Sequence, residues 1–174
     1  MSTTLIVFFV FAALLRLGSL FVSKRNEARL RAEGAEEFGA GNTRLMAVLH
    51  ATFYVAAFVE GWWRGSHMDA LAWFGLALYG VSMLVLLYVI RELGSVWTVK
   101  VFLAKRHILN QTWLFRTVRH PNYFLNILPE LVGLALAMKA WLTLTILLPC
   151  YLVVLFRRIK VEEEVMRERF RAYQ

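Results

Sequence analysis

The sequence predicts an all-α integral membrane protein with about five transmembrane helices. Apolar residues make up 59% of the 174 residues and the mean hydropathy is +0.55, whereas a soluble domain contains about 45 to 50% apolar residues. These residues gather in runs close to the ~20 residues that a helix needs to cross a bilayer. The sequence holds no glycine fingerprint of a Rossmann domain. We therefore expect 1–174 to form a single membrane domain.

The predicted spans follow one another along the chain with charged or glycine-containing segments between them. In order they cover 3–22, 45–63, 70–90, 123–138 and 140–156. The first is expected to be a retained helix, because no basic region precedes it and no small-residue cleavage site follows it. The segment 24–44 mixes Glu, Arg and Ala before several glycines. It predicts a helical extension of the first span that ends in a flexible turn.

The last half of the chain, 91–174, is the expected catalytic region. Its first part, 91–122, is too long for a simple turn and too apolar for a disordered loop. We expect this part to fold back onto the membrane face as a hairpin or as two short interfacial helices, with Ala104–His107 as the exposed bend. The final part, 157–174, predicts a charged continuation of the last helix.

Basic residues alternate between the segments that join the spans. Five Lys or Arg residues lie in 24–44, six in 91–119 and six in 157–171, out of a net charge of +8. The positive-inside rule then places the N-terminus outside and the C-terminus in the cytoplasm. Because the charge is not gathered in one patch, a nucleic-acid partner is not expected. The single cysteine, Cys150, lies within a span and is not expected to be a nucleophile.

Two polar clusters, 119–123 and 157–164, lie at mirror positions about Lys139 with an apolar run on each side of it. If these runs are antiparallel helices joined by a tight turn, His120 lies level with Arg158. Each arm would then be roughly 25 Å long at ~1.5 Å per residue, close to the ~30 Å hydrocarbon thickness. The clusters would therefore meet where the membrane gives way to water.

Polar residues also enter the fourth predicted span. Proline suits the first turn of a helix, so His120 and Pro121 mark its start. Tyr123, Asn126 and Glu130 follow on one face, where polar groups are costly in a membrane unless they face protein or a cavity. This pattern favours a functional site at the start of the fourth predicted span. The alternative is that Arg119, His120 and Tyr123 only anchor the helix among lipid headgroups.

Four further charged or ionisable residues have two interpretations each. Glu162 and Glu163 either face the mouth of the fourth span or form ordinary salt bridges on a solvated helix. In one interpretation Arg16 and His50 point into the same cavity. In the other, the Arg16 side chain extends to the inner membrane face. Glu60, near the outer end, has less reason to be functional. No cluster of His, Cys and carboxylates has the spacing of a metal site.

The two polar clusters resemble the isoprenylcysteine carboxyl methyltransferase family. Arg119-His120-Pro121-Asn122-Tyr123 matches its Arg-His-Pro-x-Tyr pattern, and Glu162-Glu163 with Met166 matches the later Glu-Glu-x-x-Leu. The resemblance covers about the last third of the chain and implies a membrane methyltransferase that uses S-adenosylmethionine without a Rossmann domain. Trp113-Leu114-Phe115 stands where the family usually has Gly-Pro-Tyr. This departure affects the acceptor more than the cofactor.

The resemblance is to a bacterial branch, some of whose members resemble methyltransferases of long-chain phenolic or pyrone lipids. It implies a bacterial inner-membrane protein and a lipophilic acceptor, either a prenylcysteine carboxylate or a phenolic or pyrone lipid hydroxyl. The oligomeric state stays open. The cofactor-binding residues that it implies are Arg119, His120, Pro121, Tyr123, Asn126, Glu162 and Glu163.

The acceptor decides whether the enzyme needs a base. A carboxylate with a pKa near ~4 is already ionised at neutral pH, whereas a phenol near ~10 is not. His120 and Glu130 are the candidates for such a base. Arg158 is the third catalytic candidate, because it or Arg119 would hold the cofactor carboxylate.

Two other classes compete with the methyltransferase. Sterol reductases resemble this family in their C-terminal half and bind NADPH, but they usually carry more spans and more basic residues for the extra phosphates. A non-catalytic membrane adaptor or small transporter is the second alternative. A transporter would be expected to contain internal repeats and broken helices, which the sequence lacks.

Overall fold

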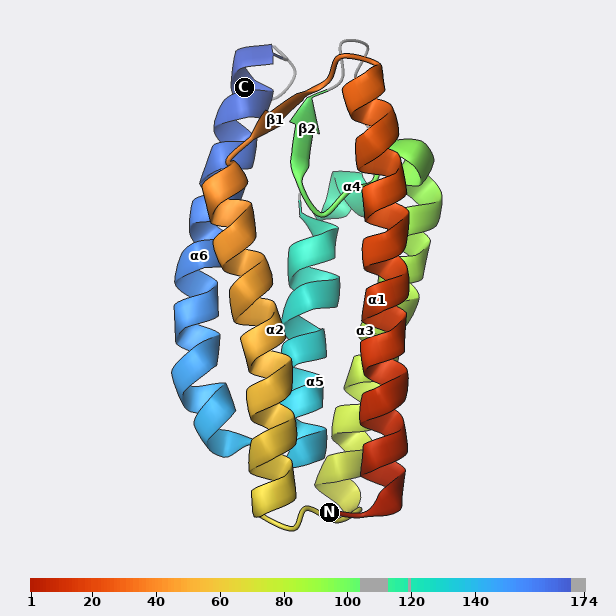
Figure 1. Ribbon diagram of the computed structural model, residues 1–174, viewed down its shortest axis with the longest axis vertical. Coiled ribbons are helices and arrows are strands. Elements are labelled where there is room, and N and C mark those ends of the chain that lie inside the picture. Colours follow the sequence, from red (N-terminus) through yellow and green to blue (C-terminus); the bar gives the residue numbers. More distant parts are fainter. Residues whose placement is uncertain (104–112, 119, 170–174) are drawn as a thin grey trace.

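The computed structural model describes residues 1–103, 113–118 and 120–169, which form a bundle of long helices (Figure 1). Its elements, in chain order, are α1 (Thr3–Ala32), β1 (Glu36–Phe38), α2 (Ala40–Trp63), α3 (Ala70–Leu93), the short 3₁₀ turn η1 (Gly94–Val96), β2 (Val101–Leu103), α4 (Trp113–Thr117), the π-helical turn η2 (Asn122–Ile127), α5 (Leu128–Met138) and α6 (Trp141–Arg169). The predicted all-α membrane architecture is confirmed.

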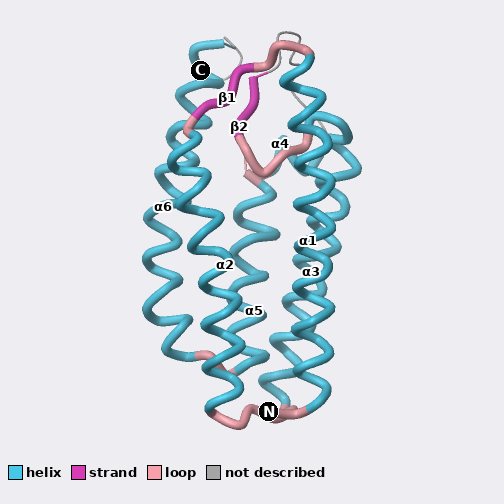
Figure 2. The backbone as a smooth tube through the Cα atoms, viewed as in Figure 1, coloured by secondary structure: helices cyan, strands magenta, loops and turns pink. Residues whose placement is uncertain are grey.

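The two ends of the bundle differ in character. The end of α6 and both strands lie at one end, called here the polar end, while the N-terminus lies at the opposite end (Figures 1 and 2). Within the described residues, four helices are long and apolar enough to cross a membrane, namely Thr3–Ala32, Ala40–Trp63, Ala70–Val96 and Trp141–Arg167. The remaining predicted span, 123–138, corresponds to a shorter apolar helix, Asn122–Met138. It is also the most deeply buried helix of the bundle.

Two glycines let α3 and α5 pack backbone to backbone. A Cβ atom on Gly75 would lie 2.4 Å from the Ala137 nitrogen, and one on Gly133 would lie 2.7 Å from the Tyr79 nitrogen. Real side chains do not tolerate such distances, so only glycine fits at both positions. Small residues at helix contacts are characteristic of membrane bundles. This contact holds α5 firmly against α3.

The turn between α5 and α6 is fixed by Glu60. Its carboxylate accepts hydrogen bonds from the amides of Leu142 at 2.9 Å and Thr143 at 2.8 Å, so it caps the first turn of α6. Lys139 adopts the left-handed conformation, with φ of 55°, between the two helices. Glu60 is thus explained by its role in the fold.

The predicted C-terminal hairpin is present, since α5 and α6 run antiparallel from the tight turn at Lys139 (Figure 1). Along its length α6 packs mainly against α2 and less against α5. His120 contacts Glu163, and Arg158 contacts Tyr123. Long side chains thus join the two arms at the polar end.

A short antiparallel ribbon replaces the flexible turn predicted near Gly34–Gly41. The helical extension is confirmed, since α1 continues to Ala32. Beyond it β1 pairs with β2, with Glu37 opposite Phe102. In its described part, 91–122 therefore forms neither an internal hairpin nor only interfacial helices. Its strand pairs with a segment far away in the sequence, which local alternation cannot reveal. The predicted bend Ala104–His107 lies outside the described residues.

Candidate functional site

His120 and Tyr123 form one wall of a polar cluster at the polar end. Both are buried, and their rings stack with centroids 5.7 Å apart. Tyr123 belongs to η2, where backbone hydrogen bonds join residues five apart in the sequence instead of four apart as in an α-helix. Such π-helical turns occur frequently at functional sites. Pro121 immediately precedes this turn and is also buried.

Two carboxylates from α6 form the opposite wall. The Tyr123 hydroxyl donates to Glu162 at 2.7 Å, and His120 Nε2 lies 3.3 Å from Glu163 Oε1. His120 Nδ1 also lies 3.9 Å from Glu162 Oε1. The Glu163 side chain is about one quarter exposed, at 24%, and that of Glu162 is exposed by 32%. Both carboxylates are therefore partly exposed, and Glu163 also pairs with Arg167 at 3.3 Å.

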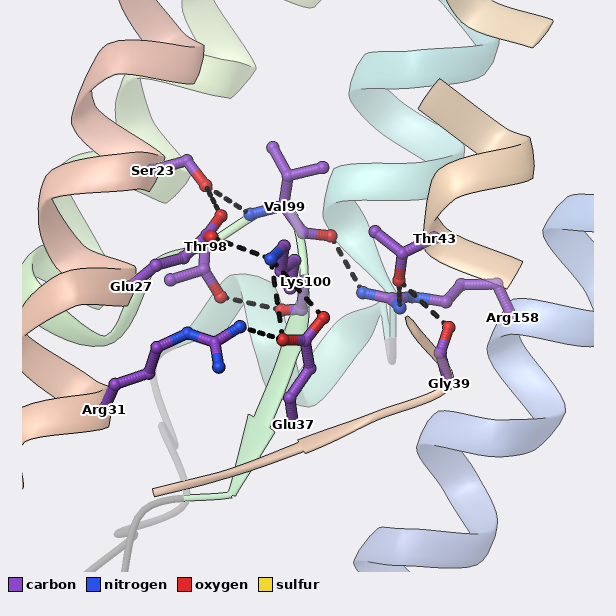
Figure 3. Close-up of polar contacts among 10 residues, drawn as sticks. All are labelled: Ser23, Glu27, Arg31, Glu37, Gly39, Thr43, Thr98, Val99, Lys100 and Arg158. Atoms are coloured by element: carbon purple, nitrogen blue, oxygen red, sulfur yellow. Dashed lines mark hydrogen bonds and ion pairs between the residues drawn. The ribbon is translucent and has the colours of Figure 1, made fainter. Parts of the chain in front are cut away.

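Arg158 joins this cluster to the rest of the bundle. Its side chain is almost fully buried, with the residue 2% exposed. Its Nε donates to the Tyr123 hydroxyl at 3.2 Å, and one terminal nitrogen donates to the Val99 carbonyl at 2.8 Å. The other terminal nitrogen donates to the Thr43 hydroxyl (Figure 3). Three of its N–H groups are thus already used by the protein.

Asn126 lies one turn further into the bundle and is fully buried. Its Nδ2 donates to Asn122 Oδ1 at 3.0 Å. Its Oδ1 finds no hydrogen-bond donor among the described residues. A buried acceptor without a partner costs about 1 to 3 kcal/mol. A bound molecule that donates a hydrogen bond would remove this cost.

Glu130 lies in a second polar cluster, deeper in the bundle and called here the inner cluster. It is fully buried, forms an ion pair with Arg16 and accepts a hydrogen bond from the Tyr54 hydroxyl. His50 Nε2 lies 3.4 Å from the same carboxylate. The inner cluster continues through Tyr79, whose hydroxyl lies 3.0 Å from that of Tyr54.

The structure thus separates the predicted residues into two groups. His120, Tyr123, Arg158, Glu162 and Glu163 meet at the polar end. Glu130 instead meets Arg16 and His50, which were expected to share a cavity. Arg16 pairs with Glu130 instead of extending to the membrane face. Arg119 lies outside the described residues. In the described ranges, no group of three His, Cys, Asp or Glu residues could hold a metal ion.

Several contributors were not predicted from the sequence. Thr43 and Tyr54 could have been found, since they share one face of α2 with His50 at helical spacing. Val99 contributes a backbone carbonyl, so its side chain carries no signal. Tyr79 on α3 reaches the inner cluster from a span that otherwise looks uniformly apolar.

Comparison with known proteins identifies the family to which the chain is similar. The family model of the isoprenylcysteine carboxyl methyltransferase (ICMT) family matches residues 73–168, more than half of the chain. A Haemophilus influenzae protein, described as uncharacterized, is 42% identical over 156 residues, which cover 90% of this chain and 91% of that protein. The uncharacterized protein YpbQ of Bacillus subtilis is 25% identical over 154 residues, covering 88% and 90% respectively.

No solved structure matches the chain significantly. The matched region begins near the start of α3 and ends in the last turns of α6. It therefore contains His120, Tyr123, Arg158, Glu162 and Glu163. The chain belongs to the isoprenylcysteine carboxyl methyltransferase family.

Proposed function

We propose that the protein is an S-adenosylmethionine-dependent O-methyltransferase that acts on a lipophilic acceptor at the membrane face. The observation that supports this best is the polar cluster, where His120 and Tyr123 face Glu162 and Glu163 within the matched region. The acceptor is a prenylcysteine carboxylate or the hydroxyl of a phenolic or pyrone lipid. Membership of the family supports a membrane methyltransferase.

The residues present fit the cofactor. Glu162 and Glu163 offer carboxylates, and Asn126 offers a buried Oδ1 that lacks a donor. These acceptors suit the ammonium group and ribose hydroxyls of S-adenosylmethionine, which supplies an activated methyl group when it is bound. Its carboxylate needs donors, which His120 and Arg119 would provide. Arg158 would mainly hold the Tyr123 hydroxyl, because it already donates hydrogen bonds to Tyr123, Thr43 and Val99.

The acceptor determines the remaining chemistry. A carboxylate acceptor is already ionised, so the site needs only to align it with the methyl group. A hydroxyl acceptor must lose a proton, which His120, next to Glu163, would take. Glu130 remains a second candidate, although Arg16 and Tyr54 already occupy its carboxylate. Either acceptor would reach the site sideways from the lipid, between the helices.

Orientation in the membrane is part of the proposal. The polar end, with the C-terminal part of α6, would face the cytoplasm, where S-adenosylmethionine is made. The protein would span a bacterial inner membrane, with its N-terminus on the outer side. The supporting observation is the concentration of Lys and Arg in the three segments assigned to that side.

Calorimetry with S-adenosylhomocysteine, the demethylated product, tests the cofactor assignment on detergent-purified protein. We expect saturable binding by the wild type, which His120→Ala and Glu163→Gln weaken about tenfold or more through loss of hydrogen bonds to charged groups. Glu164→Gln is the matched control, since Glu164 is the next residue on α6 and is exposed. Binding of NADPH instead would favour a reductase. Binding of neither would favour a non-catalytic adaptor.

A further inference from the structure

A short segment outside the helices holds Arg158 in position. This segment, Thr98–Phe102, is called here the strap, and it includes the start of β2. The Val99 carbonyl accepts a hydrogen bond from Arg158 at 2.8 Å, and the Val99 amide donates to the Ser23 hydroxyl of α1 at 2.9 Å. One strap residue thus connects α1 to the cation that contacts Tyr123 (Figure 3).

Lys100 fixes the strap next to this point. Its Nζ lies 3.1 Å from Glu27 of α1 and 3.4 Å from Glu37 of β1. Glu27 also accepts a hydrogen bond from Ser23 at 2.9 Å. Arg31 forms a further ion pair with Glu37. A single lysine therefore joins α1 and β1 to the strap, as Figure 3 shows.

These ion pairs are partly shielded from water. Glu27 is 14% exposed and Glu37 15%, whereas Lys100 is 30% exposed. Charges in such a setting interact more strongly than the exposed pairs that contribute about 0 to 1 kcal/mol. The shielding suits a contact that maintains a geometry. A buried guanidinium on a long side chain has a defined position only if its acceptors are fixed.

We propose that Lys100 is a positioning residue for the methyltransferase site. By pairing with Glu27 and Glu37 it places the Val99 carbonyl, and that carbonyl holds Arg158 against the Tyr123 hydroxyl. Tyr123 in turn donates to Glu162, so the position of the strap sets the geometry of the cofactor pocket. This inference rests on the proposed function, because it concerns the same pocket. Lys100 itself acts through the strap and touches no ligand.

The test measures S-adenosylhomocysteine affinity by calorimetry on the full-length protein in detergent, with thermal unfolding of each variant alongside. We expect Lys100→Met to weaken binding about tenfold, within the range of couplings between contacting residues. Lys100→Arg keeps the ion pairs and should restore affinity to within about twofold of the wild type. The matched control is Arg29→Met, since Arg29 pairs only with the exposed Glu33 on α1 among the described contacts.

A double mutant distinguishes positioning from a general loss of stability. If Lys100 acts through Arg158, adding Lys100→Met to Arg158→Lys should weaken binding no further. Full additivity of the two changes would overturn the proposal, as would wild-type affinity in Lys100→Met. A wild type that does not bind S-adenosylhomocysteine would instead refute the proposed function itself. Equal losses of affinity in Lys100→Met and Arg29→Met would also overturn the inference.

Discussion

Tyr123 connects the two walls of the polar cluster through its hydroxyl and its ring. Its hydroxyl accepts from Arg158 and donates to Glu162, while its ring stacks on His120. Tyr123→Phe keeps the ring and removes both hydrogen bonds. We expect about a tenfold loss of S-adenosylhomocysteine affinity, because both lost bonds involve charged groups. Tyr88→Phe, at an exposed tyrosine on α3, should leave the affinity unchanged.

The Arg16–Glu130 pair makes a different prediction, about stability. Glu130 is fully buried, so Arg16→Met would leave its charge without a cation and cost about 3 to 5 kcal/mol in the free energy of unfolding. Removing the charge on both sides, with Arg16→Met and Glu130→Gln together, should recover most of that loss. Unfolding in mixed detergent micelles measures both variants. A double mutant no more stable than the single one would contradict this account of the pair.

At the scale of elements, close packing of α3 on α5 fixes the helix that follows η2. Gly75→Ala and Gly133→Ala each force a methyl group against backbone atoms of the partner helix. We expect each to destabilise the protein by about 1 to 3 kcal/mol, the usual cost of overpacking. Gly80→Ala is the control on the same helix, because a Cβ there meets nothing within 4 Å. If Gly80→Ala were equally destabilising, close packing would not be the cause.

The start of α3 supplies a pH-dependent contact. Asp69 caps this helix by accepting from the Ala72 amide at 2.9 Å, and Lys139 donates to it at 2.7 Å. Two hydrogen bonds hold the pKa of the Asp69 carboxyl below its usual range. The bond from Lys139 has the larger effect and the bond from the Ala72 amide the smaller. Its contribution to stability is therefore present above the unfolded pKa of about 3.9 and lost as the pH falls through the lower folded pKa.

Asp69→Asn keeps a capping side chain but removes the charge. We expect the wild type to have the higher Tm at pH 7 and the difference to shrink as the pH falls below about 4. Thermal unfolding of the two proteins across that range measures the effect. A difference in Tm that stays constant with pH would show that the Lys139 contact contributes nothing through charge.

The elements also show where sequence reasoning succeeds and where it stops. Hydropathy predicts the long helices because lipid requires long apolar runs. The costly burial of polar residues on one face of 123–130 indicates polar clusters, but it does not reveal that Tyr123 and Glu130 lie in different ones. The β1–β2 ribbon was missed, since its two strands are short and far apart in the sequence. The contact of Arg158 with Val99 was missed because a backbone carbonyl has no sequence signature.

At the scale of the whole molecule, the polar cluster lies at one end of the bundle and the turn between α5 and α6 lies at the other (Figure 1). The apolar runs on either side of Lys139 predict the hairpin of α5 and α6, but they do not predict that α6 packs mainly on α2. That packing depends on contacts among three helices, so no pattern within one helix reveals it. Long side chains bring Glu162 to Tyr123 and Glu163 to His120.

Orientation is also a property of the whole molecule. The positive-inside rule predicts that the polar end faces the cytoplasm. A fluorescent protein that folds only in the cytoplasm, fused after Gln174, should therefore be bright in bacterial cells. A fusion at the same position to alkaline phosphatase, which is active only outside the inner membrane, should be inactive. The reverse pattern would contradict the assigned topology.

The most direct test of the methyltransferase assignment follows the methyl group itself. Purified protein is incubated with tritium-labelled S-adenosylmethionine and a total bacterial lipid extract, and label in the organic phase is counted. We predict transfer by the wild type and by Glu164→Gln, and loss of transfer in Glu163→Gln. If the wild type gives no more label than heat-inactivated protein, with extracts that contain prenylcysteine and phenolic lipid acceptors, the account of this site is wrong.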